Sequence, residues 1–213
     1  VLMFSHISYN NKKQTIAKNE MNDVITITII KKSVLADEVI VAAVRADKNA
    51  PTTFTEVDKK EISKLNLGQD IAYLIDQTPS IVTTSDAGAG VGYTSMRIRG
   101  SDQTRINVTI NGIPLNDAES QNVFWVNMPD FASSTDNIQI QRGVGTSTNG
   151  AAAFGATIDL QTSKLNDSAY AEISNSYGSF NTWKNTVRIG TGLIKNKFSF
   201  DGRLSHISSD GYI

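Results

Sequence analysis

Two arginines of this chain combine a distinctive chemistry with an unusual position. Arg99 and Arg142 each close an alternating apolar and polar run, and a glycine follows each of them directly. A guanidinium group can donate fork-shaped, charge-assisted hydrogen bonds and stays ionised when it is partly desolvated. From position alone, each could also be a solvent-exposed side chain at the end of a strand.

Residue types used in catalysis are present but poorly arranged. The two histidines, His6 and His206, lie in the two terminal segments, and neither has a carboxylate nearby at the spacing of a metal site or a proton relay. Asp117 and Glu119 could act as acid and base, but on a strand they would share one face without an evident cleft. We predict that the chain is not an enzyme, with no catalytic residue and no metal site.

The glycine-rich stretch from Thr83 to Tyr93 invites comparison with a phosphate-binding loop. Gly88, Gly90 and Gly92 alternate with small residues, but no Lys-Ser or Lys-Thr pair follows them, and a strand rather than a helix comes next. Nucleotide binding is therefore not indicated, and we predict no cofactor.

Composition narrows the class of protein. The chain has 213 residues, 39% of them hydrophobic, which is enough for a core, and a net charge of -1 gives no basic surface for nucleic acid. It has no cysteine, so disulfides and thiolate metal sites are excluded. No run of 18 apolar residues predicts a membrane helix, and Val1 to Ser5 do not resemble a signal peptide. We expect an internal fragment of a longer protein.

The middle of the chain predicts strands and a helical region. Met96 and Ile98 alternate with arginines, and a second alternating run from Ile106 to Ile110 meets Asn111-Gly112, the dipeptide that best fits a tight hairpin turn. Further strands are expected around Ile138 to Ile140 and from Ala156 to Leu160. Thr55 to Gln77 is predicted to be helical, with Asp58 as the cap of Lys59 to Leu65 and an apolar face of Ile71, Leu74 and Ile75 that ends at Thr78-Pro79.

Both ends of the chain have β-like patterns. Leu2 to Tyr9 and Val24 to Ile30 predict two strands, separated by the polar stretch Asn10 to Asp23. From Ala169 onward, three runs of about ten residues alternate, a length that suits tilted membrane-crossing strands but also half-buried soluble ones. Short turns at Tyr177 to Phe180 and Ile194 to Lys197 join these runs. Three such strands cannot close a barrel.

Two segments together resemble the plug domain of TonB-dependent outer-membrane receptors. They are SMRIRGSDQTRINVTINGIPLN (Ser95 to Asn116) and DNIQIQRGVGTSTNGAAAFGATIDL (Asp136 to Leu160). The resemblance implies an α+β plug domain, a small mixed sheet with short helices, followed by the start of an antiparallel transmembrane β-barrel. It also implies a place in the cell outer membrane, with the plug inside the barrel and the N-terminal part in the periplasm.

The same resemblance suggests four parts of the chain. Residues 1–35 are similar to the tail of a carboxypeptidase-regulatory-like β-sandwich that precedes the plug in receptors of Bacteroidetes type. Residues 36–50 are similar to a TonB box with its linker, residues 51–165 to the plug, and residues 166–213 to the first barrel strands.

The family resemblance assigns an energy-coupling role to the segment before the plug. An unpaired β-prone segment on a flexible tether suits strand addition to the sheet edge of another protein, here the periplasmic domain of TonB. The alternative is an ordinary strand of the upstream sandwich or of the plug. The candidate coupling residues are Asp37, Glu38, Val39, Ile40, Val41, Ala42 and Ala43.

The resemblance also assigns locking and ligand-binding roles. Arg99 and Arg142 would pair with glutamates on the inner barrel wall, which are absent from this chain. Three loops would face a ligand outside the cell, and Phe124 and Trp125 would either stack on that ligand or pack in the plug core. The candidate ligand-binding residues are Asp86, Gly88, Gly90, Ser101, Asp102, Gln103, Asn116, Asp117, Glu119, Gln121 and Asn122.

These observations predict a fragment of a TonB-dependent receptor that binds an external ligand, a ferric siderophore by default, and imports it with energy coupled through TonB. Its partners would be TonB, the small-molecule cargo, the outer membrane and its own missing barrel residues. The alternative is a soluble β-rich adhesin or carbohydrate-binding module.

Overall fold

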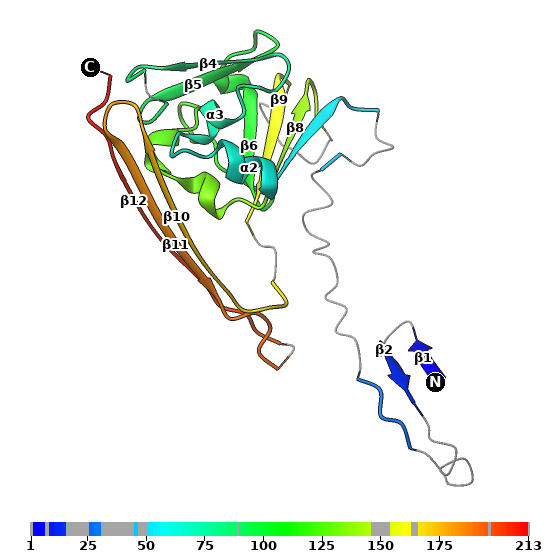
Figure 1. Cartoon of the computed structure of the whole chain (residues 1–213). Helices are drawn as coiled ribbons and strands as arrows, with labels where there is room; N and C mark the ends of the chain where they lie inside the picture. Colours follow the sequence, from blue (N-terminus) through cyan, green and yellow to red (C-terminus); the bar gives the residue numbers. More distant parts are fainter. Residues whose placement is uncertain are drawn as a thin grey trace. The chain divides into compact units, whose positions relative to one another are not determined.

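The computed structural model describes residues 2–6, 9–15, 26–30, 45–46, 51–88, 90–145, 154–162, 166–195 and 197–212 (Figure 1). The chain forms two compact units, Val1–Asp37 and Glu38–Ile213, which we consider separately. Within the described residues, no helix is both long enough and apolar enough to cross a membrane.

The first unit contains an antiparallel hairpin of β1 (Leu2–His6) and β2 (Tyr9–Gln14). The polar stretch that begins at Asn10 therefore starts as a strand, because pairing with β1 outweighs its weak β propensity. The predicted strand at Val24 to Ile30 is wrong over residues 26–30, which have no regular secondary structure. These residues touch β2 through only isolated bonds, such as Asn10 N to Ile30 O at 2.9 Å.

The second unit is built on a five-stranded mixed sheet with the order β3-β8-β9-β6-β7. Strands β6 and β9 run parallel, and the other neighbours are antiparallel. The strands are β3 (Phe54–Asp58), β6 (Ile106–Ile110), β7 (Ile113–Pro114), β8 (Asn137–Arg142) and β9 (Ala156–Gln161). We call this sheet, with the helices and hairpin that pack on it, the α/β body (residues 54–162).

The two faces of this sheet differ in chemistry although both are buried. One face is apolar and meets α2 (Lys59–Leu65), α3 (Ile71–Leu74) and Trp125 in the core. Its strand residues are Ile106, Val108, Ile138, Ile140, Ala156, Ile158 and Leu160. The opposite side, which we call the polar face, consists of Asn107, Thr109, Gln139, Gln141, Thr157 and Asp159.

The helical prediction for Thr55 to Gln77 is partly confirmed. Asp58 caps α2 through a capping box with Glu61, as the sequence indicates. Residues 54–58, however, form β3, because Val57 gains a place in the core opposite Ile138 by pairing with β8. Residues 66–70 then separate α2 from α3, so one predicted helix becomes a strand and two short helices.

The predicted turns follow the residues that favour positive φ. A hairpin of β4 (Ile81–Ser85) and β5 (Thr94–Ile98) ends one residue earlier than predicted, because Arg99 already has a φ of 51°. Asn111 and Gly112 have φ values of 51° and 81°, which confirms the predicted tight turn between β6 and β7.

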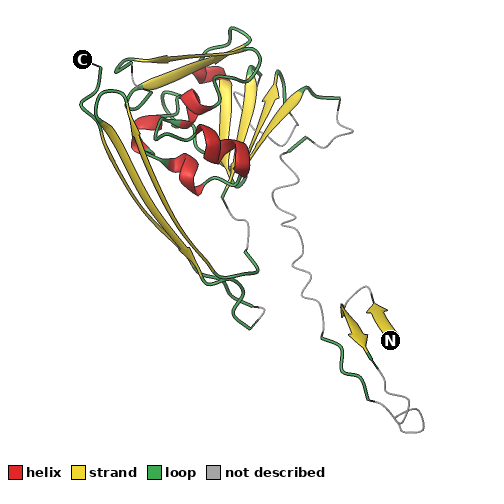
Figure 2. Cartoon of the chain, viewed as in Figure 1, coloured by secondary structure: helices red, strands yellow, loops and turns green. Residues whose placement is uncertain are grey.

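A second, three-stranded antiparallel sheet follows the body in the order β10 (Tyr170–Gly178), β11 (Thr182–Gly190) and β12 (Asp201–Ser208). We call it the long sheet, and it confirms the three predicted alternating runs. One face is polar and lies against the body. The other is exposed and apolar, with Ile173, Tyr177, Trp183, Val187, Ile189 and Leu204 between 42% and 80% exposed. Figure 2 shows the helices between the five-stranded sheet and the long sheet.

Candidate functional site

The two arginines singled out by the sequence come together at one end of the body. Arg99 Nη1 donates to the carbonyl oxygen of Arg142 at 3.2 Å, and Arg142 Nη1 donates to the carbonyl of Pro79 at 3.4 Å. Arg99 is exposed and Arg142 is half-buried. Within the described residues neither forms an ion pair with a carboxylate, so the carboxylates proposed to hold them would have to come from elsewhere.

The charged contact between the α/β body and the long sheet is centred on a carboxylate of the body, not on one of its arginines. Asp130 of the body is 2% exposed, and its carboxylate lies 2.7 Å from Lys184 Nζ and 2.9 Å from Arg203 Nη1. Lys184 is on β11 and Arg203 is on β12. The body therefore supplies the carboxylate, and the long sheet supplies the two cations.

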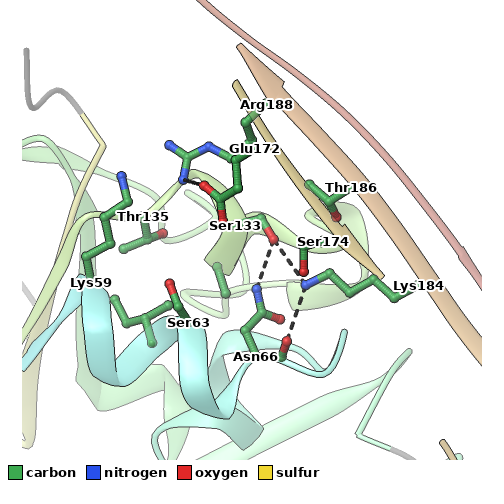
Figure 3. A pocket seen from close by; sticks show the side chains of 12 residues that line it. Lys59, Ser63, Asn66, Ser133, Thr135, Glu172, Ser174, Lys184, Thr186 and Arg188 are labelled. Atoms are coloured by element: carbon green, nitrogen blue, oxygen red, sulfur yellow. Dashed lines mark hydrogen bonds and ion pairs between the residues drawn. The ribbon is translucent and has the colours of Figure 1, made fainter. Parts of the chain in front are cut away.

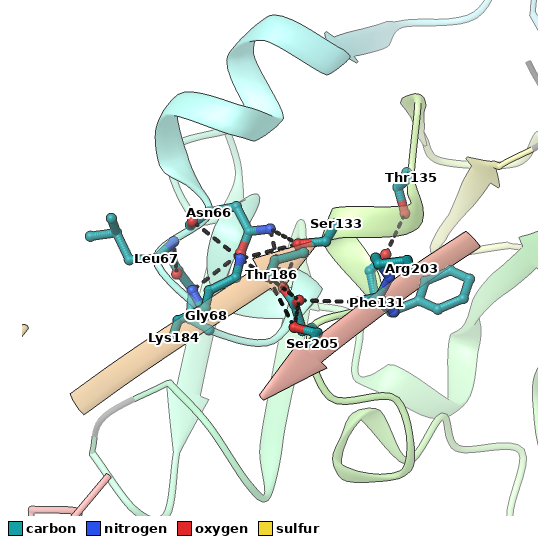
Figure 4. Close-up of polar contacts among 12 residues, drawn as sticks. Asn66, Leu67, Gly68, Phe131, Ser133, Thr135, Lys184, Thr186, Arg203 and Ser205 are labelled. Atoms are coloured by element: carbon teal, nitrogen blue, oxygen red, sulfur yellow. Dashed lines mark hydrogen bonds and ion pairs between the residues drawn. The ribbon is translucent and has the colours of Figure 1, made fainter. Parts of the chain in front are cut away.

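Hydroxyl and amide groups complete the surroundings of the Asp130 carboxylate. Figure 4 shows Lys184, Thr186, Arg203 and Ser205 of the long sheet reaching toward Asn66 and Ser133 of the body. The side chains that donate to Asp130 besides the two cations are Asn66, Ser133, Thr186 and Ser205. We call Asp130 and these six partners the Asp130 cluster.

Asp130 has a left-handed backbone conformation within this cluster. It has a φ of 52° and stands directly before the short 3₁₀ helix η4 (Phe131–Ser134), a conformation that aspartate adopts more readily than most residues. Burial by itself raises the pKa of this carboxyl. Hydrogen bonds from Lys184, Ser133 and Ser205 outweigh that effect, so the pKa of Asp130 lies below its ordinary value.

A polar cavity of about 90 Å³ adjoins the Asp130 cluster between α2, η4 and the long sheet. Figure 3 shows Lys59, Ser63 and Asn66 on one side of it, and Glu172, Ser174 and Arg188 on the other. Arg188 Nη1 lies 3.9 Å from Glu172 Oε2. The body and the long sheet thus meet at a largely polar, incompletely filled junction.

Sequence reasoning missed the Asp130 cluster. Asp130 stands in a loop between predicted strands, and nothing nearby in sequence marks it as paired. A usable signal was the common face of Lys184 and Thr186 on one predicted strand and Arg203 and Ser205 on the next. Two cations on neighbouring polar faces predict a carboxylate opposite them.

The first predicted ligand loop is the tip of the β4–β5 hairpin. Asp86 is exposed, and Gly88 has a φ of 71° beside Tyr212. Gly90 is buried, accepts the backbone N–H of Asp70 at 2.7 Å, and has no room for a side chain because an added Cβ would lie 3.0 Å from the Tyr73 ring. Gly90 therefore anchors this loop to α3, whereas the Asp86 side chain is exposed to solvent.

Asp70 also contacts the β4–β5 hairpin, through its side chain. Its carboxyl is buried and accepts the Thr94 hydroxyl at 2.9 Å. Burial raises the pKa of Asp70, and the bonds from Thr94 and the Gly92 backbone oppose that shift.

The second and third predicted loops are tied to each other. Buried Gln103 donates from Nε2 to the carbonyl oxygen of Val123 at 2.6 Å. Ser101 exchanges backbone hydrogen bonds with Ile98. Asp102 caps the 3₁₀ helix η2 (Gln103–Arg105), and the bond from the Thr104 hydroxyl, with weaker help from Arg105, lowers its pKa.

Most polar groups of the third loop are engaged within it. The side chain of Asn116 bridges this loop to β6, since it accepts from Val108 N and donates to the carbonyls of Ile106 and Gln121. Asp117 accepts from the Ser120 hydroxyl and from two backbone N–H groups, which lowers its pKa.

Other members of the third loop differ in exposure. Gln121 donates to the carbonyl of Ala118, Asn122 is half-buried, and Glu119 is exposed. The two aromatic residues of this loop separate: Trp125, in the 3₁₀ helix η3 (Trp125–Asn127), is buried in the core, and Phe124 is 46% exposed.

The structure therefore joins the second and third loops, and it places the first beside α3 and Tyr212. The candidate coupling residues Asp37 to Ala43 lie outside the described residues. The chain is described again at Arg45 and Ala46.

Residues 46–157 match the family model described as the TonB-dependent Receptor Plug Domain. A comparison with curated proteins found no significant match. Among solved structures, P. aeruginosa FpvA bound to a heterologous pyoverdine shares 18% identity over 76% of this chain and 21% of that chain, with a TM-score of 0.63.

Two further structures have the same fold. The alcaligin outer-membrane receptor FauA from Bordetella pertussis shares 18% identity over 78% of this chain and 28% of its own, with a TM-score of 0.61. The copper transporter OprC shares 15% identity over 79% and 25%, with a TM-score of 0.56. The chain thus spans between 21% and 28% of the length of these proteins. The matched family is one of receptors rather than enzymes, and the chain belongs to the family of TonB-dependent receptor plug domains.

Proposed function

We propose that this chain is the plug and the first wall strands of an outer-membrane receptor that imports a small ligand with energy supplied through TonB. In this proposal the α/β body is the plug. The long sheet is the beginning of the barrel wall that surrounds it.

The observation that supports this proposal best is the chemistry of the long sheet. Its polar face meets the body through the buried contacts of Asp130 with Lys184 and Arg203. Its other face exposes a continuous set of apolar side chains, including Trp183 and Leu204. A wall strand of an outer-membrane barrel needs this alternation, apolar toward lipid and polar toward the lumen.

The three plug loops are the proposed ligand-binding surface. Asp86, Glu119 and Phe124 are exposed, and they would contact the ligand directly. Gly90, Gln103 and Asn116 would instead fix the shapes of their loops, because their contacts are within the body. This division refines the set of predicted ligand-binding residues.

A ferric siderophore is the proposed cargo, in line with the pyoverdine and alcaligin receptors that share this fold. The copper transporter with the same fold indicates that the fold alone does not select the cargo. Energy coupling would enter at Asp37 to Ala43, by strand addition to the periplasmic domain of TonB.

Uptake by iron-starved cells tests this proposal. Deletion of the reading frame should abolish the uptake of at least one radiolabelled iron chelate from a panel. The intact gene should restore it, and a gene lacking the codons for Asp37 to Ala43 should restore binding of the chelate but not its uptake. Unchanged uptake of every chelate after deletion would contradict the siderophore assignment.

A further inference from the structure

Arg45 is fixed on the five-stranded sheet immediately after the proposed coupling segment. Its side chain is 10% exposed, and the guanidinium spans three adjacent strands. Nη2 donates to Glu56 Oε1 of β3 at 3.3 Å and to Asn137 Oδ1 of β8. Nη1 lies 3.5 Å from Asp159 Oδ2 of β9. One side chain therefore connects this point of the chain to three strands.

Ala46 is held by a side-chain amide that imitates a neighbouring peptide group. The N–H of Ala46 donates to Gln139 Oε1 at 2.8 Å, and Gln139 Nε2 donates to the carbonyl oxygen of Ala46 at 3.0 Å. Gln141 orients Gln139 by donating to the same Oε1 at 3.0 Å. Arg45 and Ala46 are thus attached to the polar face through side chains, which can separate one contact at a time.

The chemistry of the polar face allows it to be uncovered while the sheet stays folded. Amide and hydroxyl groups such as those of Gln139 and Thr109 exchange protein hydrogen bonds for water at little net cost. The isoleucines of the opposite face would pay the full hydrophobic penalty. Arg45 and Ala46 can therefore leave Gln139 and Asp159 without disrupting the core.

The Arg45–Asp159 contact favours such a departure. Asp159 is fully buried, and Thr109 donates to its Oδ1 at 2.7 Å. Its Oδ2 has no hydrogen bond among the described residues, and the Arg45 guanidinium stands 3.5 Å away. An ion pair that is buried but incompletely hydrogen-bonded recovers little of its desolvation cost, so water that reaches both Arg45 and Asp159 on release offsets the loss of their contact.

We propose that the polar face is a release seat for Arg45–Ala46: when the coupling segment is pulled, these two residues leave Gln139 and Asp159 first, while the sheet remains folded. This inference rests on the proposed function, which supplies the pull. Arg45 and Ala46 are the first residues after Asp37 to Ala43 that the structure describes.

Thiol labelling of the intact protein in outer-membrane vesicles tests whether the seat opens separately. The chain has no cysteine, so the thiol of an Ala46→Cys variant is unique within these 213 residues. Ala156→Cys is the matched control, because Ala46 and Ala156 are both buried alanines, and Ala156 lies on the apolar face of β9. The Ala46→Cys thiol should react with a maleimide at least about tenfold faster, because local opening exposes it and only global unfolding exposes the control.

Weakening the hydrogen bonds to Ala46 should increase the difference between the labelling rates of Ala46→Cys and Ala156→Cys. Gln139→Ala removes both bonds to Ala46 and should accelerate labelling of Ala46→Cys about tenfold more. It should leave Ala156→Cys unchanged. Asp102→Asn alters a solvent-accessible cap elsewhere, with little effect on global stability, and should leave the ratio of the two rates unchanged. Equal rates for the two thiols in every background would overturn the release seat without touching the receptor assignment.

Labelling in energised cells tests the pull. Cargo and an intact proton gradient should raise the Ala46→Cys rate, and a protonophore should remove that rise. If the two thiols label differently but neither rate responds to the protonophore, the seat is not opened by force. That result would overturn the inference together with the coupling role, and it differs from the result that overturns the seat alone.

Discussion

Two buried carboxylates of the α/β body sit at its two contact regions and are treated differently by their surroundings. Asp130, at the junction with the long sheet, receives two cations and four neutral donors. Asp159, on the polar face, has Thr109 on one oxygen and only the distant guanidinium of Arg45 beside the other. Both are almost completely inaccessible to water.

The pKa directions report this difference. Burial tends to raise the pKa of both groups, but the donors around Asp130 overcome it and its pKa falls below the ordinary value. At Asp159 burial outweighs the hydrogen bond from Thr109 and the charge of Arg45, and its pKa rises. Burial in turn lowers the pKa of Arg45. The donors around Asp130 therefore compensate for the burial of its charge, whereas the burial of the Asp159 carboxylate is only partly compensated.

Asparagine substitutions of the two carboxylates should differ strongly in their effects on the free energy of unfolding. This is the largest difference that we expect. Asp130→Asn leaves Lys184 and Arg203 facing an amide, and it should lower the free energy of unfolding by about 3–5 kcal/mol. Asp159→Asn removes a poorly satisfied charge and should cost less than about 1.5 kcal/mol at pH 7. Equilibrium denaturation in urea, followed by tryptophan fluorescence, measures both. Equal losses would contradict the comparison.

A double-mutant cycle measures the coupling free energy between Asp130 and Lys184. Lys184→Met combined with Asp130→Asn should destabilise less than the sum of the single changes, with a coupling of about 0.5–3 kcal/mol. Denaturation of all four proteins gives the coupling directly. Lys184→Met combined with Asp102→Asn serves as the control, since Asp102 is an exposed cap, and that pair should be additive within about 0.5 kcal/mol.

The two carboxylates should also give pH dependences of opposite sign. Asp130 has a lowered pKa, so its stabilisation is present above the ordinary pKa of 3.8 and is lost as the pH falls through the lower folded value. Asp159 has a raised pKa, so its contribution is present below 3.8 and is lost as the pH rises through the higher folded value.

Urea denaturation between pH 3 and pH 7 measures these slopes when the wild type is compared with each asparagine variant. The destabilisation caused by Asp130→Asn should grow with rising pH, whereas the effect of Asp159→Asn should shift toward stabilisation. Parallel pH dependences of the two differences would show that the two sites are not distinguished by their donors.

The smallest effect on stability is expected from the arginines that the sequence singled out. Arg99→Ala and Arg142→Ala each remove long bonds to carbonyl groups, and each should cost less than about 1 kcal/mol in urea denaturation. If they lock the plug to the rest of the barrel, the double variant should still raise cell permeability to large antibiotics. Unchanged permeability would remove that role and leave Asp130 as the joint supported by the structure.

Local signals account for what could be predicted from the sequence. The capping box at Asp58 and the turn at Asn111-Gly112 depend on residues within four positions of each other. The alternation after Ala169 gave the long sheet for the same reason. The strand at Phe54 to Asp58 escaped prediction because its pairing partner, β8, lies about 80 residues away in the chain.

The two contact regions needed the structure. The Asp130 cluster gathers Asn66, Lys184 and Arg203, which are 54 to 73 residues distant in sequence from Asp130. The polar face was equally hidden, because alternation in INVTI, NIQIQR and ATIDLQ normally places the polar residues in water. Here both faces of the sheet are buried, and only the tertiary arrangement reveals what covers the second one.

Asp130 holds the α/β body against the long sheet. A thiol introduced by Ala132→Cys, at a residue that is 1% exposed and lines the junction cavity, reports directly on this contact. We expect Asp130→Asn to increase its maleimide labelling by about two orders of magnitude, while Asp102→Asn leaves it unchanged. An unchanged labelling rate in Asp130→Asn would show that Asp130 does not hold the two parts together.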